Sequence, residues 1–323
     1  MYGVHKAIRV RLDAIGILMA ICLLCSACAD KEEFPDVVWS GVVSAHAVEV
    51  GSDTLLWQRH EDADLKILAI GNSFTINAAT YLPWLVDCLN EDSVCVARLT
   101  QSGCSLTMHW DNHVDNKPNY DFYYSDSRGW TLSEIKTVDA ALTALDWDII
   151  VIQQQSGLAG VWSSYWALPG LVQLFRQTNP NAKIAWHYTW PYREGTNHGD
   201  FARYDENPQK MYEAILEAGD NASEDLDIKI PSATLIWEMR QQYPEIEDKF
   251  SEDGYHISND IALFALSTLW YECLVTPYLS TSSLDLERYP DEINPERFAK
   301  AKEIIRRLMG ADDEQNSVPM LHI

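Results

Sequence analysis

Basic residues are scarce in this 323-residue chain. It has 24 Lys and Arg against 48 Asp and Glu, and its formal net charge is −24. This balance argues against a nucleic-acid partner, because the phosphate backbone is bound mainly through Lys and Arg. It also disfavours strongly anionic substrates, since the sequence has no evident basic cluster. An acidic, self-repelling surface is instead typical of a soluble protein outside the cell or on its surface.

The N-terminal segment lacks an apolar run long enough to cross a membrane comfortably. Residues 15–24 are apolar and follow the basic Lys6, Arg9 and Arg11, an order that is typical of a targeting segment. Small residues then lead to Cys28, and this sequence resembles the lipobox of bacterial lipoproteins, although Cys25 stands where Leu is usual.

The lipobox resemblance implies that Cys28 is lipidated and becomes the mature N-terminus. Residues 1–28 would then be a lipoprotein-type signal segment, and the protein would be exported to the bacterial cell envelope. We expect an outer-membrane lipoprotein that faces the periplasm or the surface and touches the membrane only through its lipid anchor. A plain cleaved signal peptide is the alternative.

Cysteine is sparse beyond residue 28. Cys88, Cys95, Cys104 and Cys273 remain there, with no CxxC pair and no zinc-ribbon spacing. An oxidising compartment would permit disulfides, and Cys88 and Cys95 flank a short turn across which they could pair. Four cysteines allow three connectivities, so the pairing stays open.

From residue 65 onward, apolar segments of strand length alternate with helical patterns, without repeats or low-complexity segments. This alternation predicts a parallel sheet with helices on both faces. We expect a tether over 29–62, one domain over 63–310 and a frayed tail over 311–323. The expected strands are 65–70, 94–99, 147–152, 182–188 and 228–232, and the main expected helices are 78–89, 132–145, 168–178, 208–218, 257–274 and 295–308.

The first expected strand ends at Gly71-Asn72-Ser73 and passes directly into a helix. Open α/β folds place their ligands at the carboxyl ends of the strands. Ser73 would be exposed there as a candidate nucleophile. Taken alone, it fits a helix N-cap better, because Ser is a common capping residue.

Residues far along the chain supply partners for such a nucleophile. Asp253 and His256 are three residues apart just before a helical pattern, so the carboxylate can reach Nδ1 and leave Nε2 free to take a proton from a serine. Gly103 and a glutamine at the end of the third strand are suited to an oxyanion hole. The structural alternatives are that Asp253 caps the following helix and that Gly103 only makes a turn.

Together these residues resemble the SGNH (GDSL-type) hydrolases over about residues 65–275. Gly71-Asn72-Ser73-Phe74-Thr75 is similar to their first block, with Asn in place of the usual Asp. Gly103 matches the second-block glycine, and Asp253-Gly-Tyr-His256 matches the last-block Asp-x-x-His. With Gln153-Gln154-x-Ser156-Gly157 included, the set resembles an uncharacterised SGNH-like domain family of exported bacterial proteins.

This resemblance implies a three-layer αβα, flavodoxin-like fold with a central parallel sheet of about five strands in an order near 2-1-3-4-5. It also implies a carboxylic or acetyl ester hydrolase with Ser73 as nucleophile, His256 as base and Asp253 orienting the base. The Ser73 and Gly103 amides would hold the oxyanion. The third-block asparagine of the family is absent, and we expect Gln154 to donate an amide in its place. No metal or cofactor is expected.

Two segments rich in polar and aromatic residues, 104–130 and 189–207, are interpreted as functional loops. Because aromatic rings can stack on sugars, we expect O-acyl groups on extracellular carbohydrate, above all O-acetyl groups, as the substrate. The candidate pocket residues are His109, Trp110, His187, Trp190 and Tyr204.

Three alternatives remain open at this level. One is a non-catalytic glycan-binding lipoprotein on a degenerate hydrolase fold. The second is a metal-dependent hydrolase that uses His109, Asp111 and His113. The third, a flavin-binding protein of the same topology, leaves Asp253 and His256 without a role.

Overall fold

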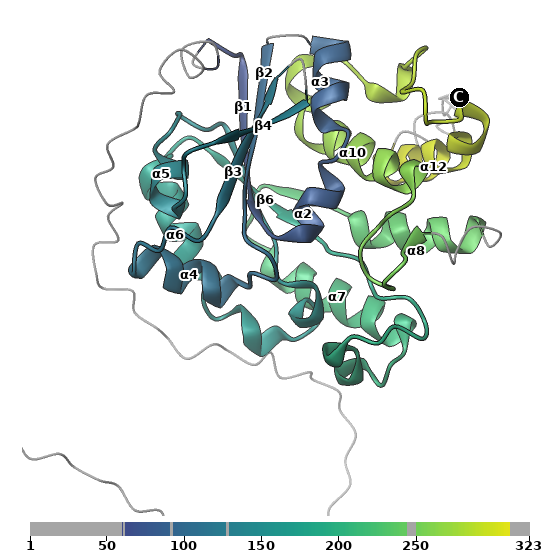
Figure 1. The fold of residues 1–323 in the computed structure, drawn as a ribbon, viewed down its shortest axis with the longest axis horizontal. Helices are drawn as coiled ribbons and strands as arrows, with labels where there is room; N and C mark the ends of the chain where they lie inside the picture. The colour runs from purple at the N-terminus through teal and green to yellow at the C-terminus, as the bar shows by residue number, and fades with distance from the viewer. Residues whose placement is uncertain (1–59, 61, 91–92, 127–128, 244–249, 311–323) are drawn as a thin grey trace, which may run out of the picture. The chain divides into compact units, whose positions relative to one another are not determined.

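The sheet of this protein is covered by helices on both of its faces (Figure 1). The structure, a computed structural model, describes residue 60 and residues 62–90, 93–126, 129–243 and 250–310. The sheet has seven strands in the order β4-β3-β2-β1-β5-β6-β7. The strands are β1 Leu65–Gly71, β2 Val94–Thr100, β3 Asp121–Asp126, β4 Gly129–Ser133, β5 Ile149–Ile152, β6 Lys183–His187 and β7 Ile228–Ile230.

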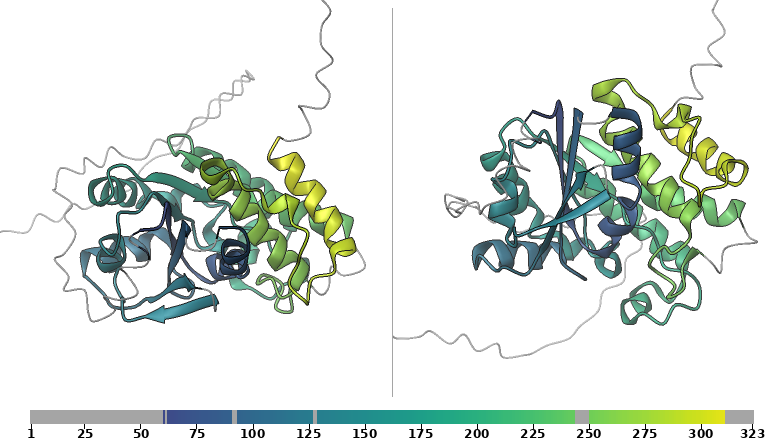
Figure 2. Two further views of the ribbon diagram at one scale, coloured as in Figure 1. Left: turned by 90° about the horizontal axis from the view of Figure 1, so that it is seen from above. Right: turned by 45° about the horizontal axis from the view of Figure 1, so that its top comes forward.

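The helices form two layers. Figure 1 shows α4, α5 and α6 on one side of the sheet and α2, α3 and α10 on the other, and Figure 2 shows α12 packed along the outside of α10. The helices are α2 Ser73–Ala78, α3 Leu82–Asn90, α4 Leu106–Val114, α5 Val138–Leu142, α6 Leu168–Thr178, α7 Pro208–Ala222, α8 Ser232–Gln242, α10 Asp260–Leu274, α11 Thr276–Leu279 and α12 Pro295–Leu308.

The predicted fold class is confirmed, and the strand count is corrected. Strands β2, β1, β5, β6 and β7 pair in parallel, which gives the expected 2-1-3-4-5 order. Strands β3 and β4 add an antiparallel hairpin at the β2 edge. The central strands β1, β2 and β5 are almost completely buried, as expected for parallel strands covered on both faces.

The predicted functional loop over 104–130 is wrong. It contains helix α4, capped by Ser105, and strand β3. The alternation that marks β3 was present in the sequence, since Tyr120, Phe122 and Tyr124 are all buried at every second position. The predicted helix over 132–145 is also too long, because β4 takes its first residues and α5, capped by Thr137, spans only Val138–Leu142.

The register brings the strand ends to one edge. Gly71 at the end of β1 pairs with Thr100 of β2, and Ile70 pairs with Ile152 of β5. A side chain at Gly71 would run into the Thr75 hydroxyl and the Gln153 side chain, so only glycine allows this tight turn into α2. The turns after β1, β2, β5 and β6 therefore meet at the carboxyl edge of the sheet.

Several predictions about processing lie outside the described residues. They concern the signal segment 1–28 with Cys28, nearly all of the tether 29–62, and the tail 311–323. The four cysteines in the described part of the chain are free thiols, Cys88 and Cys95 included. None of the helices described is long and apolar enough to span a membrane.

Candidate active site

Ser73, His256 and Asp253 form a continuous hydrogen-bonded chain. His256 Nε2 lies 2.7 Å from Ser73 Oγ, and His256 Nδ1 lies 2.7 Å from Asp253 Oδ2. Ser73 begins α2, whereas the other two residues precede α10. The side chains of His256 and Asp253 are 36% and 40% exposed. A hydroxyl, an imidazole and a carboxylate are thus aligned where solvent and a small substrate can reach them.

The Asp253 carboxylate is fixed by its own turn. Its Oδ1 accepts hydrogen bonds from the backbone N–H groups of Tyr255 and His256. Partial burial raises the pKa of Asp253, but these bonds and the imidazole lower it more, so its pKa lies below the ordinary 3.8. Gly254 has φ +92°, and a Cβ there would strike Thr196. The carboxylate is therefore ionised near neutral pH and holds the proton of His256 on Nδ1.

The N-cap of α2 is Asn72, not Ser73. Asn72 Oδ1 accepts the Phe74 N–H at 3.0 Å, and the Asn72 backbone is extended as a cap requires. Ser73 Oγ is therefore not needed to cap the helix and is free to bond with His256. This geometry answers the capping alternative for Ser73.

Two backbone N–H groups beside the nucleophile are available to a substrate. Within the described residues, neither the Ser73 N–H nor the Gly103 N–H donates to an acceptor. Gly103 is exposed and has φ +63°, a conformation that glycine adopts without strain. The turns that carry these groups are tied together by the Gln101 N–H, which donates to the Gly71 carbonyl at 3.1 Å.

Gln154 is not placed as the predicted amide donor. It is 1% exposed, and its Nε2 donates to the Ser164 carbonyl at 3.0 Å and to Ser164 Oγ at 2.9 Å. Its Oε1 accepts the Leu106 N–H. Both amide hydrogens are used within the fold, so neither is available for an oxyanion.

The sequence reasoning missed the neighbouring Gln153. Its Nε2 donates to Asn72 Oδ1 at 2.7 Å, and its Oε1 lies 2.6 Å from His187 Nδ1. The signal that could have identified Gln153 is its position directly after β5. Because Ile152 pairs with Ile70, the residues that follow these two strands lie close together, and Asn72 is one of them.

Four of the five predicted pocket residues lie inside the protein. His109, His187 and Trp190 are fully buried, and Tyr204 is 5% exposed, whereas Trp110 is partly exposed and packs on Gly170 of α6. The apolar surroundings that bury them also lower the pKa of both histidines to about 3, so they are neutral.

These buried residues have partners within the fold. His109 Nδ1 lies 2.8 Å from the Tyr120 hydroxyl, and Tyr204 donates to the Gly157 carbonyl. Because they are buried and bonded within the fold, these side chains do not form an open substrate pocket.

The alternating histidines and aspartates of 109–115 do not converge on a metal. His109, Asp111 and His113 lie on helix α4, where residues two apart point to opposite sides, and Asp115 is its C-cap. His113 bonds to the buried Asp139 at 2.9 Å. Among the described residues, no group of three or more His, Cys, Asp or Glu side chains is arranged to hold a metal ion.

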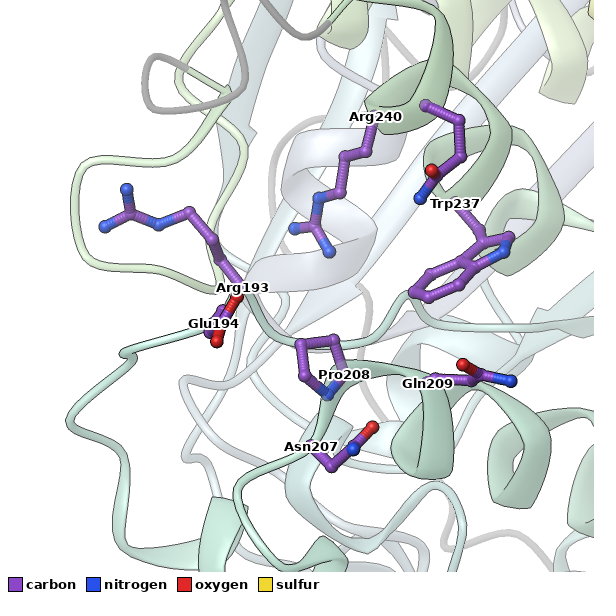
Figure 3. Close-up of a pocket in the computed structure, with 8 residues that line it drawn as sticks. Arg193, Glu194, Asn207, Pro208, Gln209, Trp237 and Arg240 are labelled. Carbon is purple, nitrogen blue, oxygen red and sulfur yellow. The ribbon is translucent and has the colours of Figure 1, made fainter.

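A cavity of about 260 Å³ lies next to the turn that carries Asp253 and His256 (Figure 3). In Figure 3 the Arg240 side chain points toward Pro208, while the Arg193 side chain points away from Trp237. The Arg193 N–H donates to the Gly254 carbonyl at 2.7 Å, so one residue that lines the cavity also contacts the turn that carries Asp253. The lining residues are Arg193, Glu194, Asn207, Pro208, Gln209, Trp237, Arg240 and Gln241.

A family model and a solved structure both relate this chain to one domain family. Residues 66–303 match the family described as Domain of unknown function (DUF4886). A crystal structure of a DUF4886 family protein from Bacteroides uniformis is similar with a TM-score of 0.68 and 30% identity, covering 80% of this chain and 98% of that one. No curated protein sequence matches the chain.

Two further solved structures are less similar. A proposed SGNH hydrolase from Slackia heliotrinireducens has a TM-score of 0.46 and 20% identity, and covers 66% of this chain and 99% of its own. An acetylxylan esterase from Geobacillus stearothermophilus has a TM-score of 0.41 and 13% identity, and covers 65% of this chain and 94% of its own. Likeness at this level carries no argument about chemistry, which has to come from the site itself.

Proposed function

Because this chain belongs to the DUF4886 family, a domain family of unknown function, its activity has to be inferred from its own site, and we propose that it is a serine esterase of the SGNH type. The observation that carries this proposal is the Ser73–His256–Asp253 chain, with both links at 2.7 Å. A nucleophile, a base and an orienting carboxylate in this geometry are the parts that serine acyl transfer requires.

The reaction would proceed in two steps. Ser73 Oγ attacks the ester carbonyl carbon while His256 Nε2 takes the hydroxyl proton, and the imidazolium then gives that proton to the departing alcohol. Water, activated by the same nitrogen, next attacks the acyl-serine and releases the carboxylic acid. Asp253 remains ionised throughout and stabilises the imidazolium.

The oxyanion would be held by backbone groups alone. The candidate donors are the Ser73 and Gly103 N–H groups, which have no acceptor in the described part of the chain and lie on turns joined by the bond from Gln101 to Gly71. Each such donor contributes about 10²–10³ in rate when it is aligned with the developing charge. Gln154 is not needed for this arrangement, because its amide is engaged elsewhere.

The proposed substrate is an O-acyl group, above all O-acetyl, on carbohydrate. This is supported by the cavity beside the turn that carries Asp253, which combines the indole of Trp237 with the side-chain amides of Asn207, Gln209 and Gln241. Asn207 Oδ1 and Gln209 Nε2 are bonded within α7, to the Lys210 N–H and to Glu213. Trp237 stacks on Tyr212 at 4.8 Å, which fixes the ring as a platform. An aromatic face with several amide donors and acceptors suits the apolar face and hydroxyl groups of a sugar ring.

Hydrolysis of p-nitrophenyl acetate by the purified protein tests the proposed function. We expect activity in the wild type and none above background in Ser73→Ala. Equal activity in the two proteins would rule out the serine mechanism.

The second candidate is a non-catalytic glycan-binding protein on the same fold. It is favoured by the absence of a third-block asparagine and by the engagement of Gln154 within the fold. This candidate predicts polysaccharide binding without any reaction of Ser73 with a fluorophosphonate.

We also propose that the protein is an exported lipoprotein of the bacterial cell envelope, either lipidated at Cys28 or secreted after plain cleavage. The basic and apolar residues that precede Cys28 support this location. Its partners would be a glycan or a small ester and, through the lipid anchor, a membrane.

A further inference from the structure

We propose that Gln153 is a positioning residue that acts through Asn72 to set the spacing between the Ser73 and Gly103 N–H groups. The inference rests on the proposed esterase function and adds residues that the catalytic chain of Ser73, His256 and Asp253 does not include. The inference is based on the hydrogen-bonded side chains of His187, Gln153 and Asn72, which lie at the ends of β6, β5 and β1.

The line of hydrogen bonds has one direction. Buried His187 is neutral, and its Nδ1–H donates to Gln153 Oε1 at 2.6 Å. Gln153 Nε2 donates to Asn72 Oδ1 at 2.7 Å, and Asn72 Nδ2 donates to the Cys104 carbonyl at 3.0 Å. Because each donor meets an acceptor, a flip would break two bonds of the Gln153 amide or three bonds of the Asn72 amide. The orientation of Asn72 is therefore set by residues on two other strands.

Asn72 joins the two turns that carry the proposed oxyanion donors. Its Oδ1 also accepts the Phe74 N–H, which holds the first turn of α2 and the Ser73 backbone. Its Nδ2 reaches the carbonyl of Cys104, the residue directly after Gly103. One side chain thus acts as acceptor toward the nucleophile turn and as donor toward the Gly103 turn. An ionised aspartate has no hydrogen to donate to the second turn.

The site is built to hold Gln153 in this position. Asn72, Gln153 and His187 are each at most 1% exposed. The Gln153 side chain lies against Gly71, where a Cβ would come within 3.3 Å of its amide carbon. Solvent cannot replace a bond lost from such a line, so without Gln153 the Asn72 amide would be held only by Phe74 and Cys104 and its orientation would be less firmly set. The separation of the two N–H groups would then no longer be fixed.

The test uses the two adjacent glutamines, which are equally buried at 1% and both hydrogen-bonded through both amide atoms. Gln153→Met and Gln154→Met each remove an amide while keeping a similar side-chain volume. The readouts are kcat and KM for p-nitrophenyl acetate and the midpoint of thermal unfolding. We expect both midpoints to fall, but only Gln153→Met to lose about 10- to 100-fold in kcat, with KM changed less than about threefold.

A second variant keeps the test decisive if Gln153→Met does not fold. Asn72→Asp retains the acceptor for Phe74 and Gln153 but loses the donor to Cys104, so kcat is again expected to fall with KM little changed. Wild-type kcat in either variant, or equal losses in Gln153→Met and Gln154→Met, would overturn the positioning role. An inactive wild type would instead defeat the proposed function, and the inference with it.

Discussion

Phe74 and Trp190 stack with their ring centroids 4.4 Å apart, and this pair joins the nucleophile turn to the histidine loop. Phe74 directly follows Ser73 on α2. The Trp190 indole N–H donates to the Tyr255 carbonyl at 2.8 Å, one residue before His256. A single buried side chain therefore contacts the neighbours of both reacting groups.

Trp190→Phe should lower kcat by more than the loss of a buried indole ring alone would. The smaller ring keeps part of the stack on Phe74 but loses the hydrogen bond to Tyr255, so the imidazole is no longer held at 2.7 Å from Ser73 Oγ. We expect kcat for p-nitrophenyl acetate to fall about tenfold or more. The matched control is Trp186→Phe, which removes an equally buried indole whose N–H has no acceptor among the described residues. Similar losses of kcat in both variants would contradict this coupling.

Asp253→Asn should leave the fold intact and nearly abolish turnover. The amide can donate to His256 Nδ1, which moves the imidazole proton to Nε2, where it blocks proton transfer from Ser73. A loss of about 10³- to 10⁴-fold in kcat is expected. The control is Glu252→Gln, which removes the same charge from the exposed neighbouring residue. A kcat within threefold of wild type in Asp253→Asn would show that the carboxylate does not orient the base.

Acid should destabilise the protein through its buried histidines. Burial lowers the pKa of His109 and of His187 to about 3 from the ordinary 6.5. Between these values the unfolded chain binds more protons than the folded one, so the free energy of unfolding falls as the pH decreases below about 6.5. Each histidine adds a slope of up to about 1.4 kcal/mol per pH unit.

His109→Gln tests this origin of the acid sensitivity. Urea unfolding between pH 4.5 and 6 should show a shallower dependence of stability on pH in the variant, by about the contribution of one histidine. An unchanged slope would assign the acid sensitivity to other groups.

A substitution in the cavity beside the turn that carries Asp253 should weaken the binding of large substrates only. Trp237→Ala removes the aromatic ring proposed to hold the sugar, but Trp237 has no contact with Ser73 or His256 through the interactions described. We therefore expect KM for an O-acetylated polysaccharide to rise about tenfold, which corresponds to about 1.4 kcal/mol of lost binding free energy. The kcat/KM for p-nitrophenyl acetate should stay within about twofold. Trp166→Ala, at a tryptophan that is 38% exposed, is the control. An unchanged KM for the polymer would remove the cavity from the binding site.

The five parallel strands and the contact between Asp253 and His256 could be predicted because their signals are local, whereas the hairpin of β3 and β4 was missed. The apolar run before Gly71 is a buried strand, and the three-residue spacing of Asp253 and His256 sets their contact within one turn. Helices α6 and α12 have the bounds that their patterns predict. Asn179-Pro180 marks the C-terminal end of α6, and Asn294-Pro295 marks the start of α12.

The interior of the site could not be predicted because it depends on contacts across the sheet. Gln153 and Gln154 are adjacent in the sequence and chemically identical, yet one faces Asn72 and the other faces Ser164. Trp190 looked suited to stacking on a substrate because it lies in a polar loop, but its ring packs on Phe74 instead. Only the tertiary arrangement decides which aromatic and amide groups point outward.

Covalent labelling tests the central claim most directly. The purified protein would be treated with a fluorophosphonate, and the modified residue identified by mass spectrometry in the wild type and in His256→Ala. The account predicts a single adduct on Ser73 that forms in the wild type and is almost absent from the variant, because His256 must take the hydroxyl proton. No adduct on Ser73, or equal labelling without His256, would contradict it.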